Sequence, residues 1–385
     1  MIAADSPLFP RPVKRHRVFG GLTERQEHVF TWIAVVVVLL MMTGWVGAIQ
    51  ETLRERRQAI AEARRAGMPA PPPVVPTQHI TTSLLGPANP PAAAFINDAM
   101  LGFLAPLRGR SGKLRFTTKL PGAPIAPAPP NATAVLSQGS EEVSSSFTAP
   151  DHPGVYDLAV KIDQATREIS DFRVVTLVPF GEKQGGRIGL YYLGNWPFER
   201  GQPAKAAYAN PAGFIEVTQE NADTHVSEHF KLRDFLTKDQ PNVWPKYLLL
   251  NPALLDKLEL TIQELEATGH PVRNMHVMSG FRTPNYNVHG GNTQGRANLS
   301  RHMYGDASDV FVDNDGDGVM DDLNHDGRID VGDADVIAQA VERVERKNPG
   351  LVGGVGVYSP CCGHGPFTHI DVRGFRARWR GFGNG

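Results

Sequence analysis

Apolar residues form one uninterrupted stretch near the N-terminus and follow periodic or alternating patterns after it. Residues 29–49 carry no charge and are long enough to cross a ~30 Å hydrocarbon core as a helix. Trp32 and Trp45 lie near the two ends, where amphipathic rings prefer the membrane interface. We expect a transmembrane helix over 29–49. A cleaved signal peptide ending at Val46-Gly47-Ala48 is the alternative, but its apolar core is normally about 7–15 residues.

Basic residues are balanced across this stretch, so charge bias alone does not orient it. They are Arg11, Lys14, Arg15, Arg17 and Arg25 before it, and Arg54, Arg56, Arg57, Arg64 and Arg65 after it. The tail 1–28 is the simpler part to keep in the cytoplasm. We therefore expect a single-pass protein of the inner (cytoplasmic) membrane whose C-terminal body is periplasmic or otherwise extracytoplasmic.

A linker is expected between the membrane helix and the folded body, over 50–94. Residues 50–66 alternate in charge, as a solvated helix does, and 69–76 read PAPPPVVP, which favours extended polyproline geometry.

Short strand-like runs separated by Pro, Gly and Ser occupy 95–179. The runs are Leu114–Thr118, Val155–Val160 and Phe172–Val178. Their spacing is compatible with a small β-sandwich of the immunoglobulin-like kind. This region carries no recognisable chemistry, so we expect it to act as a spacer or docking domain.

The rest of the chain predicts mixed structure. Residues 180–224 connect the two regions and are rich in Gly and aromatic residues. Tyr191, Tyr192 and Trp196 could stack on sugar rings, but such residues more often fill a small β core, which we favour. Over 248–268 apolar residues recur at helical spacing, and 276–279 read as a buried strand. The fold class expected is α+β, with this helix behind a sheet.

The amino-acid composition excludes few classes of protein. The chain has 385 residues, a formal net charge of −1 and 41% hydrophobic residues, so nothing points to nucleic acid. The two cysteines, Cys361 and Cys362, are adjacent and offer no disulfide framework. With His364 they could form a second metal site; a vicinal disulfide and free thiols are the alternatives.

Three ordered segments in the C-terminal half carry candidate chemistry. They read SGFRTPNYN at 279–287, SRHMYGDASD at 300–309 and FTHID at 367–371. Two imidazoles and one carboxylate, from His302, Asp309 and His369, are a set that holds Zn²⁺ while leaving one position open.

Together these segments resemble the M15 family of zinc D-Ala-D-Ala peptidases, which cut the peptides of bacterial cell walls. The resemblance covers roughly 225–385 and implies a hedgehog/DD-peptidase-like domain with His302, Asp309 and His369 as zinc ligands. Zinc lowers the pKa of a bound water towards ~7. The resemblance also implies that Arg282 contacts substrate, by pairing with a terminal carboxylate or stabilising the oxyanion. A structural salt bridge is the alternative.

The general base is where the resemblance weakens. Related enzymes carry Glu, Asp or His on the approach to the last ligand, but here 361–368 read CCGHGPFT, without a carboxylate. His364 is one candidate. Asp371 is the other, because residues two apart on a strand share a face with each other. We expect Asp371 close to the metal, as base or as an orienter of His369, and leave the base unassigned.

An acidic insertion between Asp309 and His369 resembles an EF-hand loop of the dockerin type. Its second half places acidic or amide side chains at positions 1, 3, 5, 9 and 12, a Gly at 6 and a backbone carbonyl at 7. These residues are Asp322, Asn324, Asp326, Gly327, Arg328, Asp330 and Asp333. The first half is a weaker, overlapping loop with Asp313, Asp315 and Asp317. We expect Ca²⁺ to hold the insertion together.

The function expected is a membrane-anchored zinc peptidase that hydrolyses peptidoglycan stem peptides or cross-links, as a D,D-carboxypeptidase or endopeptidase. The alternative is a catalytically silent, zinc-containing cell-wall-binding or scaffold module. The β-rich region could dock a partner from a cell-wall or division complex.

Overall fold

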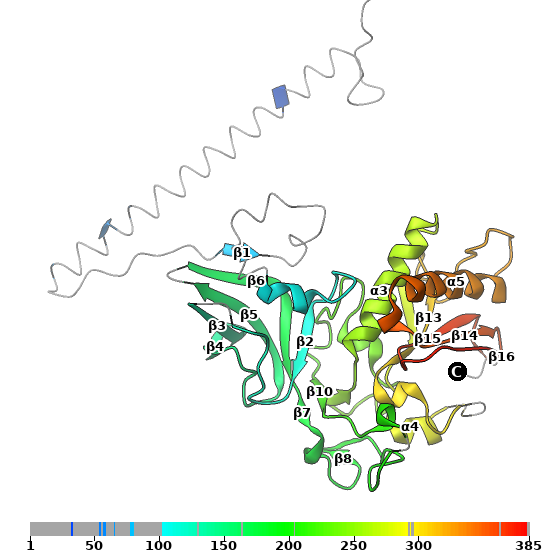
Figure 1. Cartoon of the computed structure of the whole chain (residues 1–385), viewed down its shortest axis with the longest axis horizontal. Coiled ribbons are helices and arrows are strands. Elements are labelled where there is room, and N and C mark those ends of the chain that lie inside the picture. The colour runs from blue at the N-terminus through cyan, green and yellow to red at the C-terminus, as the bar shows by residue number, and fades with distance from the viewer. Residues whose placement is uncertain are drawn as a thin grey trace, which may run out of the picture. The chain divides into compact units, whose positions relative to one another are not determined.

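The structure is a computed structural model that describes residues 102–382, except 129–130, 163–164, 204, 292, 294–295 and 362. It also describes 78–80 and the positions 32, 33, 54, 57, 58 and 65. Contacts divide the chain into two compact units, Met1–Val74 and Val75–Gly385. The second unit carries the sheets, the helices and the candidate site (Figure 1).

The predicted membrane stretch 29–49 lies outside the described residues apart from Trp32 and Ile33, as does most of the linker. Among the residues that the structure describes, no helix combines the length and apolar character needed to cross a membrane.

The fold is α+β, as the sequence predicts. The β-rich region forms a six-stranded sheet in the order β1-β6-β5-β3-β4, with β2 also paired to β6. Its strands are β1 (Gln78–Ile80), β2 (Phe116–Lys119), β3 (Ala132–Gln138), β4 (Glu141–Ser144), β5 (Gly154–Ile162) and β6 (Ala165–Thr176). The described strands of this region belong to one sheet, in which β1 and β2 both pair in parallel with the long β6.

A connecting region links this sheet to the C-terminal part. It contains β7 (Val178–Pro179), β10 (Gly213–Val217) and β11 (Lys246–Leu248) in one small sheet, and the pair β8 (Arg187–Ile188) and β9 (Tyr191–Tyr192). Single turns of 3-10 helix, η3 to η6, span Ala105–Arg108, Phe180–Glu182, Ala206–Tyr208 and Leu232–Phe235. Tyr191 and Trp196 are buried, and Trp196 Nε1 donates to the carbonyl of Met303. These two rings therefore serve the core.

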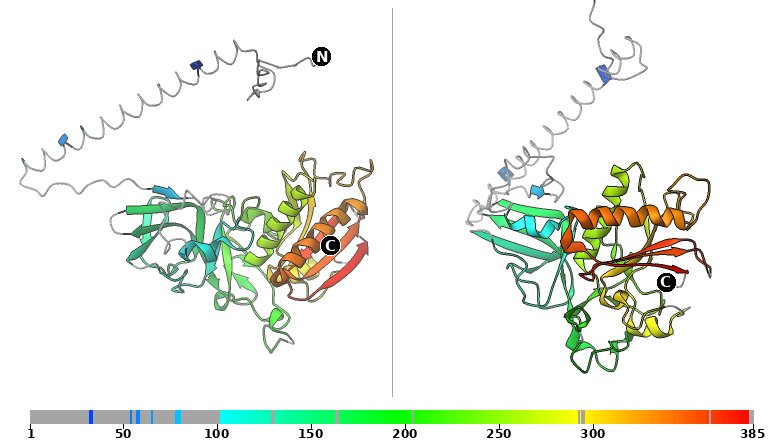
Figure 2. Two further views of the ribbon diagram at one scale, coloured as in Figure 1. Left: turned by 45° about the horizontal axis from the view of Figure 1, so that its top comes forward. Right: turned by 45° about the vertical axis from the view of Figure 1, so that its right-hand side comes forward.

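The C-terminal part is built on a five-stranded sheet in the order β12-β13-β15-β14-β16. Its strands are β12 (Met275–Ser279), β13 (Ala307–Val312), β14 (Gly354–Ser359), β15 (Phe367–Asp371) and β16 (Ala377–Phe382). The helical elements are α3 (Pro252–Ala267), α4 (Pro284–His289), α5 (Val331–Lys347), η7 (Arg301–Tyr304) and η8 (Pro349–Leu351). Helices α3 and α5 lie on one side of the sheet and α4 lies on the other (Figures 1 and 2).

Local sequence signals fix where the helices begin. Helix α3 starts with Pro252 at its first turn, and the side chain of Asn251 accepts a hydrogen bond from the N–H of Ala253 at 2.9 Å. Helix α5 starts at a capping box in which Asp330 and Asp333 accept each other's backbone N–H groups. A buried ion pair between Lys257 and Glu345 joins the two helices at 2.6 Å.

Alternation along the strands separates the two faces of the five-stranded sheet. Val310 and Ile370 belong to the core that also contains the apolar residues of α3 and α5. Residues one position away, such as Asp309 and His369, must therefore point to the opposite face. This second face, on the side of α4, carries the polar groups described next.

Candidate metal centre

Three side chains from separate elements meet on the face of the five-stranded sheet that lies on the side of α4. His302 comes from η7, Asp309 from β13 and His369 from β15, and their ligand atoms lie within 4.8 Å of one another. Asp309 Oδ1 lies 2.8 Å from His369 Nδ1 and 3.3 Å from His302 Nε2. The structure thus brings together the three residues predicted as zinc ligands. All three are buried, so a bound ion would be shielded from bulk water.

Two local features produce this convergence. Asp309 and His369 are directly paired residues on neighbouring antiparallel strands, so their side chains share one face. His302 reaches the same place because η7 ends at Gly305, which has a φ of +67°. A Cβ on Gly305 would lie 2.3 Å from the carbonyl carbon of Leu249, so only glycine fits this turn.

The outward-facing nitrogen of each ring is held by a second partner. His302 Nδ1 donates to the carbonyl of Gly280 at 2.7 Å, which leaves the lone pair on Nε2. His369 Nε2 lies 3.1 Å from Asp371 Oδ2, which leaves Nδ1 facing Asp309. Metal-binding histidines usually have such partners, because these fix the tautomer and the ring orientation. The chemistry of the donor set therefore fits a zinc ion.

Asp371 lies behind His369 rather than beside the shared ligand atoms. Its Oδ1 accepts from the N–H groups of Gly354 at 2.7 Å and Arg373 at 3.0 Å, and the Arg373 side chain pairs with it. The side chain is fully buried. Of the two roles expected for Asp371, this geometry favours orientation of the histidine over proton transfer.

Arg282 forms a buried ion pair with Asp309. Its Nη2 lies 2.5 Å from Asp309 Oδ2, and its Nε donates to Ser279 Oγ at 2.8 Å. The salt bridge considered as an alternative role is therefore present. Arg282 also lines a small cavity next to the centre, so the bridge and a contact with substrate are compatible.

Burial and neighbouring charges shift the pKa values of all three side chains. Burial and the neighbouring Arg282 lower the pKa of His302 to about 4, so this ring is neutral at pH 7. Burial alone would raise the pKa of Asp309, but the charge of Arg282 and the hydrogen bonds with His302 and His369 hold it well below its usual range. Metal ligands must be deprotonated, as these two are. Burial lowers the pKa of His369, but its hydrogen bonds with Asp309 and Asp371 raise it overall.

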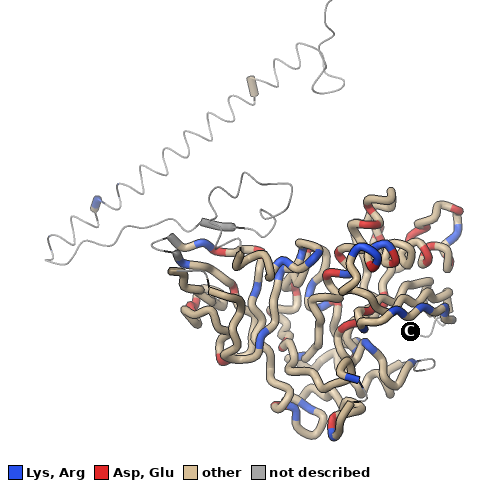
Figure 3. The backbone as a smooth tube through the Cα atoms, in the orientation of Figure 1, with Lys and Arg blue, Asp and Glu red and all other residues tan. Residues whose placement is uncertain are grey.

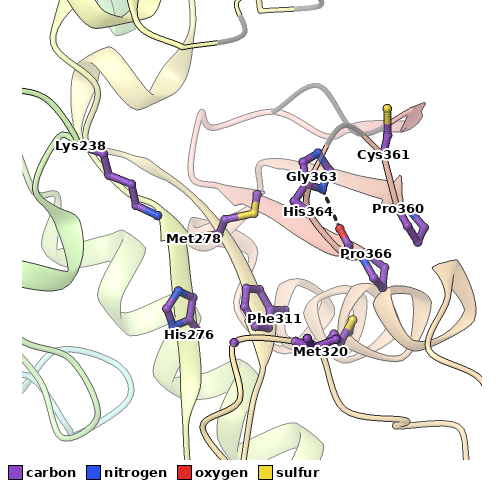
Figure 4. Close-up of a pocket in the computed structure, with 13 residues that line it drawn as sticks. Lys238, His276, Met278, Phe311, Met320, Pro360, Cys361, Gly363, His364 and Pro366 are labelled. Atoms are coloured by element: carbon purple, nitrogen blue, oxygen red, sulfur yellow. Dashed lines mark hydrogen bonds between the residues drawn. The ribbon is translucent and has the colours of Figure 1, made fainter.

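Two adjoining cavities have volumes of about 620 and 170 Å³, and neither is lined by His302, Asp309 or His369. The smaller one is linked to the centre through Arg282, which lines it and pairs with Asp309. Figure 4 shows the larger one between β12, β13, the insertion and the loop before β15. Lys238, Met278 and His364 line both cavities. His364 Nδ1 donates to the carbonyl of Gly365 at 2.7 Å, which places its remaining lone pair on Nε2. The other candidate base thus lies on the wall of the cavities.

Sequence reasoning missed two aromatic residues next to the metal centre. The ring of Trp379 lies 5.1 Å from that of His369, and its Nε1 donates to the hydroxyl of Tyr358 at 2.8 Å. A Cβ on Gly356 would lie 2.3 Å from the indole, so this glycine makes room for it. The signals available were the alternation of Gly with Val in β14, which ends with Tyr358, and the Trp379 of β16.

Cys361 is disulfide-bonded, and its N–H donates to the carbonyl of His364 at 3.2 Å. Cys362 is the only other cysteine of the chain and lies outside the described residues. A disulfide sulfur is not the thiolate that a second metal site with His364 would need. Of the three alternatives, the vicinal disulfide agrees with this state.

The insertion contains two loops with matching backbone arrangements. Asp313 Oδ2 accepts from the N–H of Gly318 at 3.2 Å, and Asp322 Oδ2 accepts from Gly327 at 2.9 Å. Both glycines have a φ of +82°. The predicted ligands Asp313, Asp315 and Asp317 place carboxylate oxygens within 4.8 Å of one another, a grouping that the described residues of the second loop do not show. Acidic positions recur along this insertion before α5 (Figure 3).

The remaining predicted calcium ligands accept hydrogen bonds from backbone N–H groups of the second loop. The carboxylate of Asp326 accepts from the N–H of Arg328, and Asn324 accepts from that of Asp326, both at 2.9 Å. Asp333, at position 12, accepts from the N–H groups of Leu323 and Asp330. Its side chain is buried at the start of α5, so the loop and helix form one folded element.

Comparison of the chain with family models, with curated proteins and with solved structures finds no match.

Proposed function

We propose that this protein is a zinc-dependent peptidase that hydrolyses peptidoglycan stem peptides or cross-links, as a D,D-carboxypeptidase or endopeptidase. The observation that carries the proposal is the convergence of His302 Nε2, Asp309 Oδ1 and His369 Nδ1. Each of these side chains also contacts a second partner, which is the carbonyl of Gly280, the side chain of Arg282 and the carboxylate of Asp371, respectively. The resemblance of its three motifs to the zinc D-Ala-D-Ala peptidases supplies the substrate class. The hedgehog/DD-peptidase-like fold is part of the same proposal.

Zinc, when bound, supplies a Lewis acid that polarises a carbonyl and acidifies a water. The chain's own residues would supply the rest. Arg282 keeps Asp309 ionised and orients it, and Asp371 holds the ring of His369 in place. His364 lines both cavities, so it is the residue that would accept the proton of the attacking water. The cavities would receive the peptide.

We propose that residues 29–49 anchor the protein in the cytoplasmic membrane and that the C-terminal body works outside the cytoplasm. Calcium in the two insertion loops would stabilise the wall formed by Gly318, Val319 and Met320 at the larger cavity. The β-rich region would dock a partner of the cell-wall or division machinery.

The test is hydrolysis of murein fragments by the purified protein with and without a chelator, together with metal analysis. Chelator-sensitive release of D-Ala or of cleaved cross-links, with about one zinc per chain, would support the proposal. His302→Gln should abolish both the zinc and the activity. Zinc without any product would contradict the peptidase.

A catalytically silent, zinc-containing module that binds the cell wall is the second candidate. One observation favours it: no carboxylate lines either cavity among the described residues, so a carboxylate base is missing there. Murein binding that depends on zinc but yields no product would identify such a module.

A further inference from the structure

A buried ion pair lies on the helix side of the five-stranded sheet, opposite to the metal centre. Lys257 of α3 and Glu345 of α5 are both buried, and Lys257 Nζ lies 2.6 Å from Glu345 Oε1. Figures 1 and 2 show the two helices side by side on this face. Removing two charges from water is costly, so such a pair stabilises a fold no better than well-packed apolar residues. Its contacts with the sheet therefore indicate what else it does.

Lys257 also contacts the main chain of Asp371. Its Nζ donates to the Asp371 carbonyl at 2.7 Å, whereas the carboxylate of Asp371 lies on the other side of the sheet, 3.1 Å from His369 Nε2. Burial lowers the pKa of Lys257, and the charge and hydrogen bond of Glu345, followed by the charge of Asp371, oppose this effect. The lysine thus interacts with the residue that orients the histidine.

Glu345 reaches the same place through two consecutive glycines. Glu345 Oε1 accepts from the N–H of Gly353 at 3.0 Å, and Asp371 Oδ1 accepts from the N–H of Gly354 at 2.7 Å. The two carboxylates therefore hold neighbouring N–H groups at the start of β14. A displacement of Glu345 would move Gly354, and with it the carboxylate of Asp371.

We propose that Lys257 and Glu345 are positioning residues of the metal centre, which act through the carboxylate of Asp371 on the ring of His369. This inference rests on the proposed function, of which it uses the zinc site alone. Groups that hold a metal-binding histidine from behind affect metal affinity, because they fix the ring orientation. The ion pair extends this support from the sheet to the two helices that cover its other face.

The experiment measures the zinc affinity of the full chain by competition with a chromophoric chelator. We expect Lys257→Met to lower the affinity by about tenfold, the lower end of the range for losing a partner of a metal-binding histidine. Glu264→Gln is the matched control. Glu264 also joins α3 to α5, through Arg343 at 2.7 Å and Lys347 at 2.5 Å, and none of its contacts among the described residues is with Asp371. This control should keep the wild-type affinity.

A double-mutant cycle separates positioning from a general loss of stability. Once Asp371→Asn has removed the carboxylate, the lysine no longer has its target, so the further effect of Lys257→Met on zinc affinity should fall to about twofold or less. A lysine that only supports the packing of α3 against α5 would lower the affinity by the same factor in both backgrounds.

Folding of the variants is checked by urea unfolding. Lys257→Met leaves Glu345 paired, because Arg378 contacts its other carboxylate oxygen. Should Lys257→Met not fold, Lys257→Met/Glu345→Gln replaces it in every measurement with the same expected fall in affinity, since removing both charges leaves neither partner buried alone.

Wild-type zinc affinity in the lysine variant, an equal fall in Glu264→Gln, or an unchanged effect in the Asp371→Asn background would overturn the positioning role and leave the zinc site intact. A chain that shows the expected affinities but hydrolyses no peptide would overturn the peptidase and support the positioning role. A wild-type chain that binds no zinc would overturn both.

Discussion

Asp371 lies 3.1 Å from Nε2 of His369, the ring nitrogen opposite to the one that faces Asp309. The carboxylate therefore controls which histidine nitrogen carries the proton. Arg373 and the N–H of Gly354 hold the carboxylate in turn. The centre thus has a supporting layer that reaches from β15 to the start of β14.

Replacing this carboxylate should weaken the metal site. We expect Asp371→Asn to lower zinc affinity about 10–100-fold, because the amide no longer stabilises the orientation and basicity of His369. Competition with a chromophoric chelator measures the affinity. An unchanged affinity combined with lost turnover would instead identify Asp371 as the base.

His364 should affect turnover but not metal content. Replacing a general base typically costs about 10²–10⁴ in rate, so His364→Gln should lower kcat by that factor and retain zinc. His289→Gln, at the exposed end of α4, is the control. Full activity of His364→Gln would show that the proton goes elsewhere.

Gly356 should be intolerant of a side chain. A Cβ there would lie 2.3 Å from the Trp379 ring, so Gly356→Ala must displace the indole that packs against His369. We expect a loss of about 1–3 kcal/mol in the free energy of unfolding, measured with urea. Gly201→Ala, where a Cβ meets nothing within 4 Å, is the control. Equal stability of both variants would show that the ring moves without cost.

The insertion should make stability depend on calcium. A ligand at 100 times its Kd stabilises a folded protein by about 2.7 kcal/mol, so saturating Ca²⁺ should raise Tm by several degrees. Asp313→Asn and Asp322→Asn should each remove part of the increase, since each lies at position 1 of one loop. A Tm that changes neither with Ca²⁺ nor with a calcium-selective chelator would contradict the assignment of the two loops as calcium sites.

A histidine far from the metal centre should give stability a pH dependence. The hydrogen bond from His229 to the buried Glu259, at 2.8 Å, raises the pKa of His229. The folded pKa then exceeds the unfolded value of about 6.5, so this stabilisation is fully present below that pH and is lost as pH rises through the folded pKa. Urea unfolding at several pH values should show a smaller slope in His229→Gln. His152→Gln, an exposed position, should keep the wild-type slope.

The sequence was sufficient to predict that His302, Asp309 and His369 come together, because their positions follow from local structure. Gly305 closes the turn after His302, and strand alternation places Asp309 on the same face as its cross-strand neighbour His369. The helix predicted over 248–268 is α3, but it begins only at Pro252, because residues 246–248 pair with β10 instead. Local capping by Asn251 fixes that boundary.

What the sequence did not predict depends on contacts between distant segments. Strand patterns near Phe116 and Val174 identify β2 and β6, but do not show that the two strands pair in parallel within one sheet. The spacing of His369 and Asp371 indicates proximity, but not which ring nitrogen the carboxylate contacts. Lys238 belongs to no motif at all, and only the packing of its loop brings it to the cavities.

Strand β15 lies between β13 and β14 although it follows both in the chain. His369 can therefore approach Asp309 and His302 only after β15 has paired with both β13 and β14 in the middle of the sheet. A chain emerging from the ribosome would not bring the three side chains together until His369, the last of them in the sequence, had been synthesised. Metal binding would therefore follow the formation of the complete five-stranded sheet, and it would take place in the cellular compartment where that sheet forms.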